Sequence, residues 1–260
     1  MISLGCDIGA IATKTVILKG DRLAAFDVTL NDGKLADAAR RSVLSVLGQA
    51  GLDLEEIPHF GGTGWGEKYI SFPHSVESSI RCLARGAYWS VPAVRTVVDI
   101  GGLSTTIISV DGKNGKAREY RTNDRCASGT GFFLDLAAQA LELKVEELGP
   151  VSLAAGGRAH ISAQCAVFGE SEIVTHVNEG AEPADIAAGI VYSIGTSVAT
   201  MVLRLGAEKE IVATGGVAKN KAVIKALEEK LGLETVKLDV DSQIIGAIGA
   251  ALNAQARNAE

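Results

Sequence analysis

The sequence predicts an α/β protein made of two related lobes, and two observations support this class. A strand–turn–strand segment occurs twice, as LGCDIGAIATKTVIL (4–18) and TVVDIGGLSTTIISV (96–110), which indicates two lobes of common design. Strand-like and helix-like segments alternate along the rest of the chain, as they do in α/β proteins. We therefore expect a first lobe over residues 1–93, a second over 94–242, and a cleft between them. A closing helix, about 243–260, can pack back onto the first lobe.

The elements of the first lobe follow its strand–turn–strand segment in order. LADAARRSVLSVLGQAGL (35–52) has apolar residues at the spacing of an amphipathic helix. PHFGGTGWGEK (58–68) predicts a strand that ends in a turn, because glycines punctuate regular structure. A further helix is expected at about 76–89.

The second lobe continues after its own strand–turn–strand segment. REYRTND (118–124) predicts a strand and loop, and a helix is expected at about 129–141, after the turn Ser-Gly-Thr-Gly. The remaining segments are, in order, a loop and helix (152–180), an apolar helix from Pro183, a strand, Gly-Gly turn and helix (210–232), and a small-residue helix (240–256).

Composition and charge favour a globular protein and disfavour nucleic-acid-binding, secreted and membrane-spanning classes. The 260 residues are 47% hydrophobic and 22% charged, which is an ordinary globular composition with room for a substantial core. The formal net charge of −6 disfavours a nucleic-acid partner. MISLGCDIGA lacks the basic and apolar regions of a secretory signal, so a cytoplasmic location is expected. The apolar stretch 184–205 includes Asp185 and several hydroxyl residues, so we expect a packed helix and no membrane partner.

The two Asp-Ile-Gly segments carry the first candidate chemistry. A glycine turn between strands lets backbone N–H groups approach phosphate oxygens closely. The first turn (residues 9–12) and the residues that follow it offer the candidate ligand-binding residues Gly9, Ala10, Thr13 and Lys14, and the second turn (residues 101–104) offers Gly101 and Gly102.

An aspartate precedes each of these turns, Asp7 in the first and Asp99 in the second. A carboxylate at such a place holds Mg²⁺ through water or orients an attacking water, so both are candidate catalytic residues. Thr13 and Lys14 would add a hydroxyl and a cationic contact. The alternative is two ordinary tight hairpins with an aspartate at a strand end, and the occurrence of two copies favours phosphate binding.

A third turn, ATGGVAKN (213–220), follows a strand and precedes a helix. Gly215 and Gly216 would let an adenosine lie against the backbone. The alternative is a simple helix start with Lys219 or Asn220 solvated. The segment is not GxGxxG and no acidic residue follows at the dinucleotide spacing, which disfavours a Rossmann NAD site.

The chain has four cysteines, at positions 6, 82, 126 and 165, and no CxxC pair. Cys6 lies in a predicted strand and Cys82 in a predicted helix, so both are interpreted as core residues. Cys126 precedes the Ser-Gly-Thr-Gly turn, separated from it by Ala127, and Cys165 also precedes a helix. From the residues alone, buried structural thiols are the commoner interpretation, and metal ligands are the alternative.

Taken together, these motifs resemble the superfamily of acetate kinase, sugar kinases, heat-shock chaperone ATPases and actin. Within it, the chain resembles the ATPase activators of 2-hydroxyacyl-CoA dehydratases and the ATPase subunits of benzoyl-CoA reductases. The residues that carry the resemblance span nearly the whole chain and are CDIGAIATKT, GTGWGEK, VVDIGG, NDRCASGTGFFLD, ISAQCAVFGESEIV and ATGGVAKN. The resemblance implies a two-lobed actin-like (ribonuclease-H-like repeat) ATPase fold with ATP and Mg²⁺ in the cleft between the lobes.

The resemblance further implies a homodimer in which Cys126 and Cys165 of both protomers hold one shared 4Fe-4S cluster. A four-thiolate site needs more than the two ligands of one chain, which agrees with a twofold dimer. The implied function is an ATP-dependent, low-potential electron donor, reduced by ferredoxin or flavodoxin, that reduces an iron–sulfur partner enzyme. Val217, Asn220 and Gln243 join the implied nucleotide-binding residues.

The sequence departs from this family pattern after the second Asp-Ile-Gly-Gly. Dehydratase activators typically carry Gln-Asp there, whereas this chain has Leu103 and Ser104. Neither side chain can replace a carboxylate or amide near a γ-phosphate, which disfavours the dehydratase branch proper. The benzoyl-CoA-reductase branch and other reductases of low-potential iron–sulfur proteins stay open. Two rival functions also stay open: a small-molecule (sugar or carboxylate) kinase of the same superfamily and a non-redox ATP-dependent switch protein.

Overall fold

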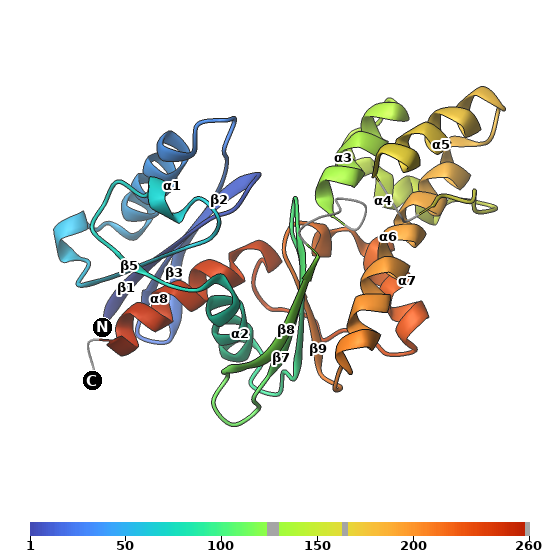
Figure 1. Cartoon of the computed structure of the whole chain (residues 1–260). Helices are drawn as coiled ribbons and strands as arrows, with labels where there is room; N and C mark the ends of the chain where they lie inside the picture. The colour runs from blue at the N-terminus through green and yellow to red at the C-terminus, as the bar shows by residue number, and fades with distance from the viewer. Residues whose placement is uncertain (124–129, 163–165, 258–260) are drawn as a thin grey trace. The chain divides into compact units, whose positions relative to one another are not determined.

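The computed structural model describes residues 1–123, 130–162 and 166–257. Its strands form two sheets of related strand order (Figure 1). The first has the order β3-β2-β1-β4-β5 and the second β8-β7-β6-β9. The strands are β1 (Ile2–Ile8), β2 (Ala12–Lys19), β3 (Arg22–Leu30), β4 (His59–Thr63), β5 (Ser75–Val76), β6 (Thr96–Ile100), β7 (Thr105–Val110), β8 (Ala117–Asn123) and β9 (Ile211–Thr214). Because β1-β2-β3 and β4 correspond in order to β6-β7-β8 and β9, the internal repeat extends from sequence to topology.

The helices occur after each set of strands, as the alternation of segments predicted. They are α1 (Leu35–Ala50), α2 (Ser79–Ser90), α3 (Gly131–Ala140), α4 (Val145–Leu153), α5 (Ala166–Asn178), α6 (Pro183–Leu205), α7 (Lys221–Leu231) and α8 (Ile245–Arg257). Short 3-10 helices are found at η1 (Leu54–Glu56), η2 (Glu67–Tyr69), η4 (Val217–Lys219) and η5 (Ser242–Ile244).

The chain divides into two compact units. The first contains residues 1–97, 108–119 and 238–260, and the second contains residues 98–107 and 120–237. The sequence-based border between residues 93 and 94 stays a prediction, as does the cleft between the lobes.

In the first unit the pleat of β1 separates two packing faces. Leu4, Cys6 and Ile8 are fully buried and belong to one core cluster with Val43 of α1. The intervening Gly5 meets the backbone of α8, which also packs on β4 and α2. Since successive strand residues point to opposite faces, α1 and α8 cover opposite faces of β1.

The second unit has a helical core around α6. This 23-residue helix is by length and composition apolar enough to cross a membrane, yet 67% of its most apolar window is buried within the protein. It packs on α4 and α7 and contributes many members of the largest core cluster. The arrangement supports the prediction of a packed helix.

Among the strands and α-helices, β3, β5 and α4 were not predicted, and β5 includes Val76, where the sequence predicted the start of a helix. The Gly149-Pro150 pair within α4 is a helix-breaking signal, because proline lacks the N–H that a helix interior needs. The helix nevertheless forms, and Glu147 accepts a 2.7 Å hydrogen bond from the backbone N–H of Lys144 at its start.

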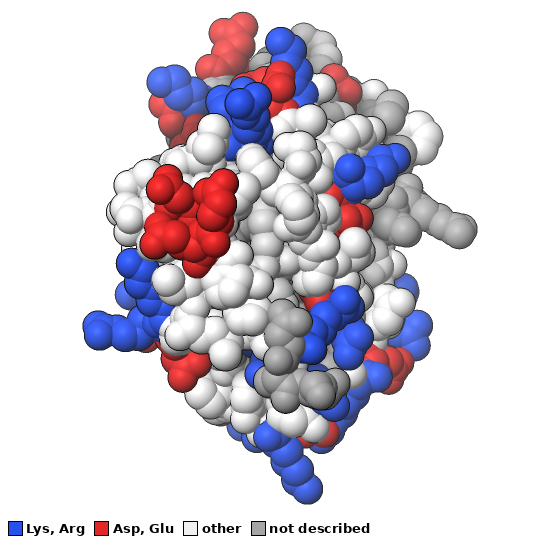
Figure 2. All heavy atoms as spheres, turned by 90° about the vertical axis from the view of Figure 1, so that its left-hand side faces the viewer, with Lys and Arg blue, Asp and Glu red and all other residues white. Residues whose placement is uncertain are grey.

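Charges of both signs are dispersed on the face shown in Figure 2. Lys and Arg side chains form small groups between groups of Asp and Glu, and the middle of this face is mostly uncharged. Such mixing limits the long-range attraction of this face for a partner of a single charge.

Candidate functional site

The first turn connects β1 to β2 and is closed by its own backbone. The N–H of Gly9 donates to the carbonyl of Ala12 at 3.0 Å. Lys14 Nζ lies 2.9 Å from the Asp7 carboxylate and 3.3 Å from the Ala12 carbonyl, so a cation sits beside the turn. A Cβ on Gly9 would lie 2.7 Å from that ammonium and 3.1 Å from the Ala12 carbonyl, so a larger residue would require Lys14 to shift. The structure thus brings the predicted residues Asp7, Gly9 and Lys14 together.

This turn leaves backbone donors available. Within the described part of the chain, neither the N–H of Ala10 nor that of Ile11 finds an acceptor. Successive unpaired N–H groups in a turn form a concavity that attracts anions. With Lys14 alongside, the turn has the donors and the positive charge that a phosphate group requires.

Thr13 is the predicted ligand-binding residue that the structure turns inward. Its side chain is fully buried, and its hydroxyl donates a 2.8 Å hydrogen bond to the side-chain carbonyl of Asn31. Asn31 follows β3 and was not identified from the sequence, where TLNDGK predicts only a polar loop.

The second turn repeats the backbone plan of the first. The N–H of Gly101 donates to the carbonyl of Ser104 at 2.9 Å. Among the described residues, the N–H groups of Gly102 and Leu103 find no acceptor. The side chain of Leu103 is 47% exposed, so this unusual apolar residue lies on the surface of the turn. The equivalent position of the first turn holds Ile11, which is 41% exposed.

Asp99 is oriented by a residue of the third turn. The hydroxyl of Thr214, at the end of β9, donates to Asp99 Oδ1 at 2.8 Å. The next residue, Gly215, has φ of +88°, and a Cβ there would collide with the carbonyl of Ile100. Only glycine fits this position, because a side chain would be both strained and crowded. The second and third turns therefore form one connected structure within the second unit.

The remaining residues of the third turn contribute to a 3-10 helix, to the core and to the cap of α7. Gly216 precedes the 3-10 helix η4, and Val217 is 4% exposed and belongs to the core. The side-chain carbonyl of Asn220 accepts from the N–H groups of Ala222 and Val223, at 3.1 and 3.3 Å, and thereby caps α7. Among the described residues, the side-chain NH2 group of Asn220 makes no hydrogen bond.

Gln243 lies apart from these residues in the chain and belongs to the first unit. It is within η5, and its N–H donates to Asp241 Oδ1 at 2.9 Å. Its predicted contact with a nucleotide stays a prediction.

The predicted turn after β4 repeats the third turn within the first unit, and this equivalence was not recognised from the sequence. Thr63 ends β4, and the following Gly64 has φ of +93° and approaches both Asp7 Oδ1 and the carbonyl of Ile8. Thr214 likewise ends β9, and Gly215 stands in the same relation to Asp99 and Ile100. The shared Thr-Gly pair in GTGWG and ATGGV was the signal available in the sequence.

The cysteines fall into two groups. Cys6 in β1 and Cys82 in α2 are fully buried, which confirms that both are core residues, and burial raises the pKa of each thiol to about 12. Cys126 and Cys165, the predicted cluster ligands, lie outside the described residues. The helices α3 and α5 begin at Gly131 and Ala166, shortly after these two positions, as the sequence predicted.

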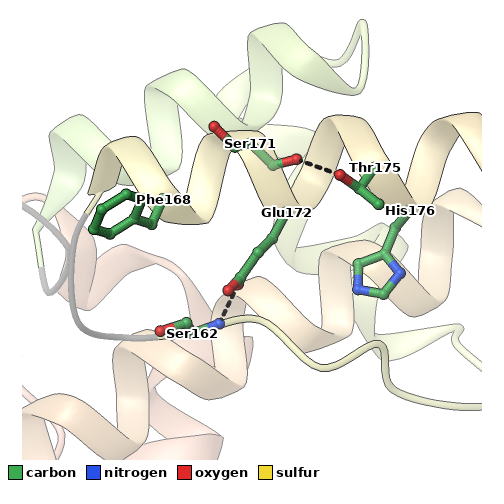
Figure 3. Close-up of a pocket in the computed structure, with 6 residues that line it drawn as sticks. All are labelled: Ser162, Phe168, Ser171, Glu172, Thr175 and His176. Carbon is green, nitrogen blue, oxygen red and sulfur yellow. Dashed lines mark hydrogen bonds between the residues drawn. The ribbon is translucent and has the colours of Figure 1, made fainter.

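A shallow pocket lies along α5 (Figure 3). Ser162, Phe168, Ser171, Glu172, Thr175 and His176 line it. The Glu172 carboxylate accepts a hydrogen bond from the N–H of Ser162, and His176 contacts the carbonyl of His160 at 3.0 Å. Nowhere in the described ranges do three or more His, Cys, Asp or Glu residues gather in a way that could hold a metal ion.

Comparison with known proteins identifies relatives along the whole chain. The model of the BadF/BadG/BcrA/BcrD ATPase family matches residues 4–254. The (R)-2-hydroxyglutaryl-CoA dehydratase activating ATPase of Acidaminococcus fermentans is 38% identical over 259 residues, covering 99% of this chain and 98% of the relative. One of the subunits of benzoyl-CoA reductase from Thauera aromatica is 32% identical over 261 residues, covering 96% of this chain and 92% of the relative.

A solved structure agrees with these relatives. The activator of the 2-hydroxyisocaproyl-CoA dehydratase from Clostridium difficile, with bound ADPNP, is 36% identical and gives a TM-score of 0.93. The match covers 100% of this chain and 97% of that chain. The predicted actin-like α/β fold and the resemblance to the activator and reductase families are confirmed.

Proposed function

Because the chain belongs to the BadF/BadG/BcrA/BcrD ATPase family, we propose that it hydrolyses ATP to drive an electron into a partner enzyme. The observation that carries the ATP part is the pair of equivalent turns, each with an aspartate, a closing Gly N–H bond and two N–H groups that meet no acceptor among the described residues. The ADPNP-bound relative supports the same ligand class.

The nucleotide contacts are assigned to each turn separately. The N–H groups of Ala10 and Ile11, with Lys14, bind phosphate oxygens through hydrogen bonds and charge. The second turn, with Gly101 and Gly102, does the same from the second unit. Gly215, Gly216, Val217, Asn220 and Gln243 are the residues proposed to hold the adenosine.

Asp7 and Asp99 are the proposed catalytic residues. Carboxylates do not bind phosphate directly, but they hold Mg²⁺ through its water ligands or orient an attacking water. An ion pair with Lys14 holds the Asp7 carboxylate beside its turn, and a hydrogen bond from Thr214 holds the Asp99 carboxylate. Both carboxylates are therefore in place before the nucleotide binds.

The redox part rests on Cys126 and Cys165. Cys6 and Cys82 are fully buried in the core, so the other two cysteines are the proposed cluster ligands. Two copies of the chain would supply the four thiolates, and a 4Fe-4S cluster held there would supply one-electron redox chemistry. The proposed protein is therefore a homodimer.

The proposed partners follow from the relatives' names, which describe dehydratase activators and a component of benzoyl-CoA reductase. The acceptor is an iron–sulfur enzyme of this kind, and ferredoxin or flavodoxin is the proposed donor. The proposed location is the cytoplasm.

The deciding experiment measures iron, acid-labile sulfide and ATP hydrolysis on anaerobically purified protein and on its Cys126→Ala variant. We expect about two irons per chain, lost in the variant, because four irons would be shared by two chains. Protein that hydrolyses ATP but stays iron-free after reconstitution would reject the electron-donor role and favour the switch. Transfer of phosphate to a small substrate would favour the kinase.

A further inference from the structure

Besides its own Gly9–Ala12 bond, the first turn is held by the buried residue Asn31. This residue is 3% exposed and follows β3. Its side-chain amide donates to the carbonyls of Gly9 and Ala10 at 2.8 and 3.2 Å, and its backbone N–H donates to the carbonyl of Ile11 at 3.0 Å. Three consecutive carbonyls of the turn therefore accept hydrogen bonds from one residue.

These bonds also fix the direction of the turn's donors. The carbonyl of Gly9 and the N–H of Ala10 belong to one planar trans peptide group, and they point in opposite directions. The same holds for the carbonyl of Ala10 and the N–H of Ile11. By binding both carbonyls, Asn31 aims these two N–H groups away from itself, and within the described residues neither meets an acceptor.

The side chain of Asn31 is itself fixed. Its carbonyl oxygen accepts the 2.8 Å hydrogen bond from the fully buried Thr13 hydroxyl. All polar groups of the amide face a partner in the first unit, so the amide has one preferred orientation. A buried network satisfied in this way keeps a unique geometry.

In the second turn the equivalent carbonyls are also bound, but by backbone N–H groups and not by a side chain. The carbonyls of Gly101 and Gly102, which correspond to those of Gly9 and Ala10, accept from the backbone N–H groups of Gly131 and Phe132 at 2.9 and 2.8 Å. There the first residues of α3 hold the turn. The two equivalent carbonyls are therefore bound in both turns. This indicates that the turn requires a fixed direction for the N–H group that follows each of these carbonyls.

We propose that Asn31 is a positioning residue for phosphate binding, which holds the N–H groups of Ala10 and Ile11 in their binding direction. Thr13 acts through Asn31 and not on the ligand. This inference rests on the proposed function, in which the first turn binds a phosphate of ATP.

The test compares the affinities of ADPNP and adenosine by calorimetry for the full-length protein and its variants. Asn31→Asp keeps the shape and the acceptor for Thr13 but removes both amide donors. We expect its affinity for ADPNP to fall at least about tenfold while its affinity for adenosine is unchanged, since a lost charge-assisted hydrogen bond has about this effect. Thr13→Val, which loosens Asn31 only, should shift the same ratio in the same direction by less.

The matched control is Ser42→Ala. It removes a buried 2.8 Å hydrogen bond to Thr15 in the same unit, away from the turn, so it should lower stability without changing the affinity ratio. If wild type binds ADPNP more tightly than adenosine but Asn31→Asp and Thr13→Val keep the wild-type ratio, the positioning role is rejected and the proposed function stands. If wild type itself does not prefer ADPNP over adenosine, the proposed function fails.

Discussion

The aspartates of the two related turns are held by different chemistry. Asp7 forms an ion pair with Lys14, whereas Asp99 accepts a hydrogen bond from Thr214. Thr63, which corresponds to Thr214, instead donates to the carbonyl of Glu77 at 2.8 Å. The backbone of the two turns is nevertheless the same, down to the Gly N–H bond that closes each. One backbone plan is therefore kept while the side chains around it have diverged.

This difference suggests a distinct role for each turn, one in binding the nucleotide and the other in its hydrolysis. Lys14 beside Asp7 lowers the local negative charge where a phosphate would approach the first turn, and the Thr214 hydroxyl orients the carboxylate of Asp99 at the second. We therefore expect the first turn to matter more for binding and the second more for hydrolysis.

The largest expected effect is on hydrolysis, from Asp7→Asn and Asp99→Asn. Each removes the charge that holds Mg²⁺ or orients water, so kcat should fall by about a thousandfold. Steady-state ATPase assays check this, with ADPNP affinity as the second readout. The division of work requires Asp7→Asn to change ADPNP affinity more than Asp99→Asn, and equal changes would contradict it.

The next effect is on stability, from Gly64→Ala and Gly215→Ala. Both glycines have positive φ and approach a backbone carbonyl, so each substitution should lower the free energy of unfolding by about 3 kcal/mol. Urea unfolding measures it. Gly48→Ala in α1 is the control, because a Cβ there meets nothing within 4 Å and should stabilise the helix by about 1 kcal/mol.

A smaller effect on kcat is expected from one of the two equivalent threonines, Thr214, and not from the other, Thr63. Thr214→Val removes the hydrogen bond to Asp99 and should lower kcat about tenfold with KM little changed. Thr63→Val removes a bond to the Glu77 carbonyl and should leave kcat at the wild-type value. Both should cost a similar, small amount of stability. A kcat loss in Thr63→Val as large as that in Thr214→Val would show that the turns work alike.

The smallest expected effect is on how the free energy of unfolding depends on pH. It arises from the two buried thiols of the first unit, Cys6 and Cys82. Burial raises the pKa of each thiol from 9.0 to about 12, so the unfolded chain loses these protons first as pH rises. The stabilisation is complete below pH 9 and falls between pH 9 and 12, by up to about 1.4 kcal/mol per pH unit for each thiol. Urea unfolding at pH 8 and 10.5 should show a shallower decline in Cys82→Ala than in wild type, and an unchanged slope would refute the assignment.

The sequence alone determined the repeat, the fold class and most candidate residues. The two Asp-Ile-Gly segments predicted equivalent turns because glycine and strand patterns are local signals, and α1, α2, α6 and α7 followed from helical spacing. The family motifs likewise placed the chain among activator and reductase ATPases.

Tertiary structure decided which groups surround those turns. Asn31 reaches Gly9 from 22 positions away, and Thr214 reaches Asp99 across 115 positions, so no local pattern could pair them. The inward direction of Thr13 was equally hidden, since a strand residue's face depends on what packs against the sheet. The sequence thus located the turns, whereas the pairing of distant buried polar groups, which must find partners on folding, determined how each turn is held.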